Sequence, residues 1–123
     1  MTFDLESVEG VAVGVARGSL DLTEIKESMA TLWSLASGRE IRVLWDLRDA
    51  QFDLSAGDVL RLAEFAKQRA PFNNLRMAFL LTKDLEFGLV RMFEAFRETK
   101  DAQIGVFRDK KHASDWIASS AAQ

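Results

Sequence analysis

Residues 39–69 read REIRVLWDLRDAQFDLSAGDVLRLAEFAKQR, and this stretch decides the fold. Its first part alternates between apolar and mostly polar side chains, with the apolar set at Ile41, Val43, Trp45 and Leu47. A period of two with branched and aromatic residues is typical of a strand with a buried face. Polar residues gather from Asp46 onward, so the carboxyl end of a central strand is expected to reach solvent there.

A helix is predicted soon after this strand. Residues 49–54 are too polar and irregular for either period and are expected to form a loop. Ser55 and Asp58 have a capping-box form, in which the serine oxygen accepts a backbone N–H and the acid occupies the positive first turn. The apolar residues that follow share one helical face: Val59, Leu62, Ala63, Ala66 and Ala70. Pro71 is expected to end the helix.

The rest of the chain repeats this change of period. Strands are predicted at residues 2–7, 11–16, 75–81 and 103–107, and helices at residues 22–36, 85–100 and after 109. Glu9 and Gly10 indicate a tight turn between the first two strands, and residues 18–20 are expected to be a connection.

The resulting order, ββαβαβαβα, predicts a single α/β domain over residues 1–123. Its sheet is expected to have five strands and to be mixed but mostly parallel. The first strand is expected to be antiparallel at an edge, and the helices are expected to cover mainly one face.

Apolar residues outside the predicted core indicate a candidate interaction surface. In the helix at residues 85–100, one stripe is expected to face the core: Leu85, Leu89, Met92, Phe93 and Phe96. Phe87 and Val90 then lie on the opposite side, and Leu60 and Phe65 lie at the flanks of the core face of the preceding helix. These four residues fit either packing at the edge of the core or an interface, and the interface interpretation predicts a homodimer.

The composition is that of an ordinary globular protein, with 123 residues, of which 48% are hydrophobic and 28% charged. The chain has no cysteine, which excludes disulfides, thiolate metal sites and cysteine nucleophiles and fits a reducing cytoplasm. No apolar run approaches the ~20 residues of a membrane span. The first residues lack the pattern of a signal peptide.

The net charge of −3 is unevenly distributed, with −6 over residues 1–60 and +3 over residues 61–123. This distribution fits two solvated faces, or a molecule that pairs with itself or with a partner through opposite charges. The acidic pI of about 5.2 and the lack of a dense Lys/Arg stripe argue against nucleic-acid binding.

Three carboxylates gather at the end of the central strand: Asp46, Asp49 and Asp53. Open α/β sheets place ligand sites at this edge, and oxygen ligands suit magnesium. The alternative is charge pairing with neighbouring arginines, namely Arg42, Arg48 or Arg76. No phosphate-binding glycine loop accompanies the aspartates, so no metal or cofactor is predicted.

No sequence motif indicates catalysis. His112, the only histidine, is expected to be exposed beside Lys110 and Lys111. The chain has no Gly-x-Ser-x-Gly, Walker or Gly-x-Gly-x-x-Gly motif, which predicts a protein that is not an enzyme. Ser55 is expected to cap its helix. A phosphorylated Ser55 is the alternative, because a helix N-terminus tolerates negative charge.

The element order, with an acidic loop and a serine-capped helix after the central strand, resembles the STAS domain of anti-sigma-factor antagonists. In those proteins the corresponding turn is similar to Asp-Ser-Ser-Gly and carries a serine that a partner kinase phosphorylates. The nearest match here is residues 53–57, DLSAG, which departs by one residue on each side of Ser55.

A more specific resemblance, over almost the whole chain, is to bacterial STAS/Sec14-like (SpoIIAA-like) proteins of unknown function. Three segments carry it: Val43–Ala50 (VLWDLRDA), Leu85–Phe93 (LEFGLVRMF) and Val106–Asp109 (VFRD). The resemblance implies a SpoIIAA-like fold and no established activity. It leaves two functional hypotheses, a non-enzymatic protein-interaction module and a carrier of a small apolar ligand or lipid.

Overall fold

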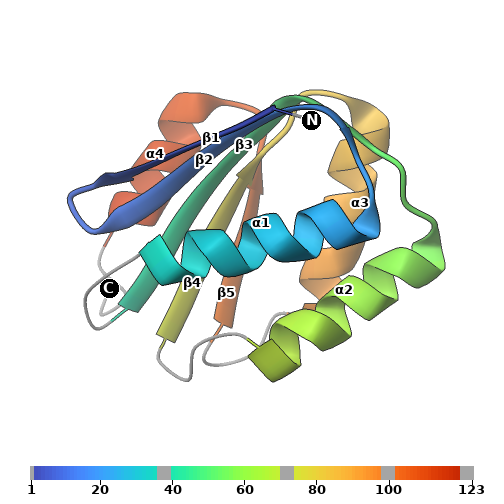
Figure 1. The fold of residues 1–123 in the computed structure, drawn as a ribbon. Coiled ribbons are helices and arrows are strands. Elements are labelled where there is room, and N and C mark those ends of the chain that lie inside the picture. The colour runs from blue at the N-terminus through green and yellow to red at the C-terminus, as the bar shows by residue number, and fades with distance from the viewer. Residues whose placement is uncertain (1, 36–39, 70–73, 98–101, 120–123) are drawn as a thin grey trace.

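The computed structural model describes residues 2–35, 40–69, 74–97 and 102–119. The elements follow the predicted order (Figure 1): β1 (Thr2–Val8), β2 (Val11–Leu20), α1 (Leu22–Leu35), β3 (Glu40–Phe52), α2 (Ala56–Arg69), β4 (Asn74–Leu80), α3 (Asp84–Arg97), β5 (Ala102–Phe107) and α4 (Lys110–Ala118). No described helix is long and apolar enough to cross a membrane.

The five strands form one sheet in the order β1-β2-β3-β4-β5, so β3 lies at its centre. β1 is antiparallel to β2 at one edge, and the other neighbours are parallel. In Figure 1, α1 lies in front of the sheet and α4 lies behind it. α1, α2 and α3 contribute to one core cluster, and α4 packs on β3, β4 and β5 through a second cluster. The predicted fold class is confirmed.

The β1–β2 hairpin has the tight turn that the sequence predicted and a close contact with α1. Glu9 and Gly10 both have positive φ, 52° and 85°, as a two-residue hairpin turn requires. Gly14 lies on the small-residue face of β2, where an added Cβ would come within 2.9 Å of the Leu32 side chain of α1. The absence of a side chain at Gly14 therefore allows α1 to approach the sheet closely.

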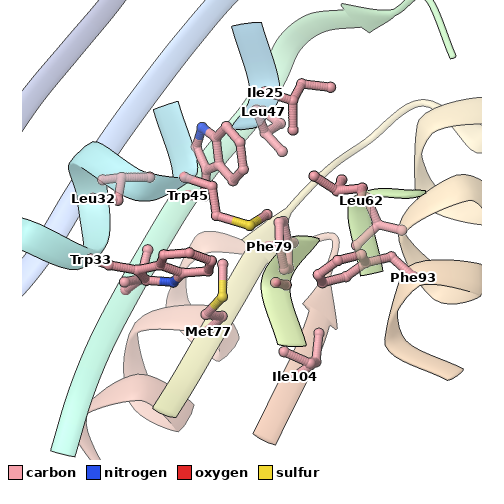
Figure 2. Close-up of a cluster of buried hydrophobic side chains, with 14 of the residues drawn as sticks. Ile25, Leu32, Trp33, Trp45, Leu47, Leu62, Met77, Phe79, Phe93 and Ile104 are labelled. Carbon is pink, nitrogen blue, oxygen red and sulfur yellow. The ribbon is translucent and has the colours of Figure 1, made fainter. Parts of the chain in front are cut away.

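A chain of aromatic rings crosses the main core (Figure 2). Trp45 of β3 is 1% exposed, and its ring lies 5.7 Å from that of Phe79. On the other side it lies 6.1 Å from the ring of Phe3 of β1. Phe79 in turn meets Phe93 of α3 edge to face at 5.7 Å. This chain connects β1, the central strand and α3 through side chains on a single face of the sheet.

The prediction for residues 18–20 was wrong, and the loop predicted at residues 49–54 is confined to Asp53 and Leu54. β2 continues to Leu20 and β3 continues to Phe52, and the two strands stay paired beyond the point where β4 ends. The pairing contains a register shift between Val15 and Arg17 and then continues to the ends of both strands. Backbone pairing with a neighbouring strand, which side-chain periodicity does not reveal, holds these polar residues extended.

The predicted core stripe of α3 was right only in part, because Phe93 is buried and Leu89 and Met92 pack against the core, but Leu85 and Phe96 do not. The buried residues are Glu86, Val90, Phe93 and Arg97. Leu85 is 66% exposed and Phe96 is 42% exposed, so two members of the predicted stripe face solvent. The stripe had the correct spacing, but the helix is rotated so that a face with a charged residue at each end meets the core.

This rotation changes the status of the four predicted interface residues. Val90 is 4% exposed and belongs to the core, which rules it out as a surface residue. Phe87 and Phe65 are half-buried against the core, and Phe65 stacks on Trp33 of α1 at 6.1 Å. Leu60, by contrast, is 47% exposed. The predictions for Ala70, Pro71 and the end of the α3 helix at residues 98–100 lie outside the described residues.

Candidate functional site

The junction between β3 and α2 exposes a serine in a well-defined backbone geometry. The Asp58 backbone N–H donates to Ser55 Oγ at 3.1 Å, and the Ser55 backbone N–H donates to Asp58 Oδ2 at 3.0 Å. Ser55, Ala56 and Gly57 are all exposed. The predicted capping box is therefore present, and it holds an exposed hydroxyl at the N-terminus of α2.

Electrostatics strengthen this cap. Hydrogen bonding from the Ser55 backbone lowers the pKa of Asp58, and the nearby Arg61 guanidinium adds to the effect at 3.0 Å. A carboxylate in the first turn also faces the positive end of the helix dipole. Asp58 consequently remains ionised below the usual pH range of an aspartate.

Three hydrogen bonds hold the segment before Ser55 in place. The Asp53 backbone N–H donates to Leu20 O at 2.8 Å. Glu86, 5% exposed in the first turn of α3, accepts the Phe52 backbone N–H at 3.2 Å, and Lys83 donates to Ala50 O at 3.3 Å. β2 and the start of α3 therefore fix the position of the Ser55 junction.

The three predicted loop aspartates do not form a metal-binding group. Among the described residues, no cluster of three His, Cys, Asp or Glu side chains could hold a metal ion. Asp46 is half-buried, whereas Asp49 and Asp53 are exposed. Asp46 and Asp49 lie within β3, and Asp53 follows the end of that strand, so the three residues are spread along extended backbone.

Asp46 instead forms an ion pair with Arg48, one of the three arginines predicted for this role. The guanidinium donates to both carboxylate oxygens, with Nε–Oδ1 at 3.0 Å and Nη2–Oδ2 at 2.8 Å. Burial raises the pKa of Asp46, but hydrogen bonds from the Arg48 side chain and backbone outweigh it, so the pKa lies below the usual value. The same pairing raises the pKa of Arg48.

The other two arginines serve α4. Arg42 donates to Ile117 O and Ala118 O, and Arg76 donates to Ser119 O. The Arg76 guanidinium also lies 4.3 Å from the Trp116 ring centre. These cations contact the carbonyl end of α4, where the helix dipole favours positive charge, so their role is structural.

His112 is exposed in the first turn of α4, as predicted. Its backbone N–H donates to the N-cap Asp109 at 3.2 Å, and its Nδ1 lies 3.4 Å from the same carboxylate. Its hydrogen-bond and ion-pair contacts are therefore with the residue that caps its own helix.

An apolar cavity of about 20 Å³ lies between the sheet and the helices, behind the Ser55 junction. Its lining includes Trp45, Phe79, Leu62 and Phe93, which Figure 2 shows packed together. Such a volume holds about one water molecule, whereas ligand pockets measure roughly 300–1,000 Å³. The cavity gives no support to the carrier hypothesis.

Sequence reasoning missed the buried charged residues. Glu86 and Arg97 were overlooked because they lie on the helix face next to the one taken as the core stripe. The sequence shows an acidic residue in the first turn of α3. It does not show that this residue contacts Phe52, which lies 34 residues earlier in the chain.

Comparisons with known proteins identify the fold. No model of a known protein family matches the sequence, and no curated protein matches it. Two solved structures are similar over nearly their whole length. An uncharacterized DUF3478-family protein with a SpoIIAA-like fold from Shewanella loihica has a TM-score of 0.59 and 22% identity, covering 95% of this chain and 93% of that one. An anti-sigma factor antagonist from Mycobacterium paratuberculosis has a TM-score of 0.64 and 13% identity. The similarity covers 96% of this chain and 94% of that one.

The chain therefore has the SpoIIAA-like, or STAS, fold, as the sequence resemblance implied. The low sequence identities limit this conclusion to the fold.

Proposed function

We propose that this protein is a non-enzymatic regulatory module that binds another protein through the end of the molecule around Ser55. We call this region the Ser55 surface and define it by its exposed residues Asp53, Ser55, Ala56 and Gly57. The observation that carries the proposal is the combination of exposure with fixed backbone geometry at this junction. A cytoplasmic location fits the absence of cysteine from the chain.

Fixed geometry matters because ordering a loop upon binding costs free energy. Here the capping box, the buried Glu86 and Lys83 hold the junction before any partner arrives. Exposed loops held by a rigid scaffold are common locations of binding residues. The Ser55 surface has this arrangement.

The charge of the region favours a partner with basic residues. Asp49 and Asp53 are both exposed, and neither forms an ion pair with a described residue. Complementary charge would accelerate association and select among partners. The same fold occurs in an anti-sigma factor antagonist, which gives independent support for a role in protein regulation.

Ser55 is the residue at which such binding would be controlled. The residue is exposed, so a kinase could reach it. Phosphorylation would add about −1.5 to −2 charges at a helix N-terminus, where the dipole favours them while Asp58 opposes them. In the unmodified protein the hydroxyl serves as the helix cap.

Site-specific photo-crosslinking in the native cell tests the proposal. A photoreactive residue at Ala56 is compared with one at Gln103, which is exposed near the start of β5, at the opposite end of the sheet. We expect one protein to be captured from Ala56 and not from Gln103. Its binding, measured with both purified proteins, should weaken in Asp53→Lys. Equal capture from both positions, or unchanged binding in the variant, would argue against the Ser55 surface.

A further inference from the structure

The two edges of the sheet differ in how well they are covered. At the β5 edge, α3 and α4 pack on opposite faces, and Ala102, Ile104 and Gly105 are buried. At the β1 edge, α1 packs on one face, and residues 4–9 are all exposed. Figure 1 shows β1 as the outermost strand on its side of the sheet. β1 is therefore the accessible edge.

The outer side of β1 carries backbone groups that have no partner among the described residues. The two-residue turn at residues 9–10 has positive φ at both positions, and in such a turn the two flanking residues are hydrogen-bonded to each other. Bonded positions alternate along an antiparallel pair, so the N–H and C=O groups of Phe3, Leu5 and Ser7 point away from β2. The β1–β2 pairing has no register shift, which makes this row of groups continuous.

Such a row is a template for a further strand, and many proteins block it with a proline or a bulge. β1 has neither of these features. It carries two exposed acids instead, Asp4 and Glu6, which lie opposite Val15 and Val13 in the pairing with β2. Val13 packs toward α4, so both acids belong to the face of the sheet on which α4 packs.

These acids exclude a second copy of the chain as the added strand. If β1 paired antiparallel with the β1 of another copy through the outward groups, odd-numbered residues would lie opposite odd-numbered ones. The registers centred on Asp4, Leu5 and Glu6 would then place Asp4 opposite Asp4, Asp4 opposite Glu6, and Glu6 opposite Glu6. Like charges directly opposite each other destabilise a strand pair, whereas opposite charges stabilise it.

We propose that β1 binds an extended segment of another protein, with basic residues at alternate positions, as an additional strand of the sheet. Asp4 already contacts Arg17 at 2.9 Å, but Glu6 forms no ion pair with a described residue, so Glu6 is the main partner for a basic side chain. Leu5 is 39% exposed and Val8 is 48% exposed, and apolar residues of the segment would cover them. Main-chain hydrogen bonds supply affinity in this mode of binding, and side chains supply specificity. This inference does not depend on the proposed function.

Amide hydrogen exchange, followed residue by residue by NMR, tests this docking. The probe is a blocked synthetic peptide of about eight residues, the length of one strand, in which lysine alternates with valine. A matched peptide carries glutamate at every lysine position. With the lysine peptide at up to about 1 mM, exchange of the Phe3, Leu5 and Ser7 amides should slow several-fold, because these amides gain acceptors. The glutamate peptide should leave their exchange unchanged, and added salt should weaken the effect of the lysine peptide.

A pair of variants tests the role of charge. Glu6→Gln should weaken binding of the lysine peptide several-fold, whereas Glu64→Gln, at an exposed position on α2, should not change it. Unchanged exchange at all three outward amides of β1 in the presence of the lysine peptide would overturn the proposal. Equal slowing by both peptides would also overturn it, because charge would then not select the partner. None of these results bears on the Ser55 surface.

Discussion

Asp46 shows how an individual charged residue can stabilise this fold without being a ligand. It is half-buried in the middle of β3, and Arg48 contacts both of its carboxylate oxygens. Its folded-state pKa lies below the usual value because these hydrogen bonds outweigh the cost of burial. A depressed aspartate pKa means that the stabilisation is present above the unfolded-state pKa and is lost as pH falls through the folded-state value.

Asp46→Asn should therefore lower the free energy of unfolding at neutral pH and reduce its dependence on pH in acid. We expect a loss on the order of 1 kcal/mol at pH 7, a value discounted for partial solvent screening. Below about pH 4 the difference from wild type should shrink, because the wild-type carboxylate becomes protonated. Urea unfolding at a series of pH values measures both effects. A difference that persists unchanged in acid would exclude the ion pair as its cause.

The capping box of α2 is the corresponding feature at the scale of a secondary-structure element. Ser55 and Asp58 exchange two hydrogen bonds, and Asp21 and Glu24 form the same pair at the start of α1. Each pair satisfies backbone donors that have no partner within the helix. The first turn of each helix is thereby defined by residues three apart in sequence.

Ser55→Ala should destabilise the protein by about 1 kcal/mol, because the Asp58 backbone N–H loses its acceptor. Ser55→Thr keeps the hydroxyl and should cost much less. Chemical denaturation of the three proteins measures the difference. If Ala and Thr proved equally stable, the hydroxyl would not be the stabilising group.

At the scale of the whole molecule, the core is nearly full. Three helices cover one face of the sheet and α4 covers the other, and the apolar cavity of about 20 Å³ lies within the three-helix side. A lipid tail does not fit in such a volume without separating the helices from the sheet. The second functional hypothesis from sequence, an apolar carrier, therefore requires an opening of the core.

Native mass spectrometry of the purified protein should accordingly show the mass of the bare chain, without added lipid. As a control, a fatty acid is added to the protein before the measurement. The mass of the chain without fatty acid should still be observed. A stoichiometric fatty-acid adduct, retained under gentle conditions, would show that the core opens and would revive the carrier hypothesis.

The sequence by itself determined those features that depend on neighbours in the chain. Alternation at Ile41–Leu47 specified a buried strand, and the spacing from Ser55 to Asp58 specified the start of α2. Glu9 and Gly10 specified the hairpin turn. These features are local, because side-chain period, capping and positive φ act over a few residues. The order of such elements was enough to predict one mostly parallel sheet of five strands with the first strand antiparallel at an edge.

Only the tertiary structure decided which face of α3 meets the core and how far β2 and β3 extend. Glu86 is buried on the same face as Val90 and Phe93, and it accepts the Phe52 backbone N–H, 34 residues away. Leu85 and Phe96 lie outside this face and are exposed. Residues 49–52 remain extended because β2 pairs with them. Both outcomes depend on partners distant in sequence, which the period of the side chains does not specify.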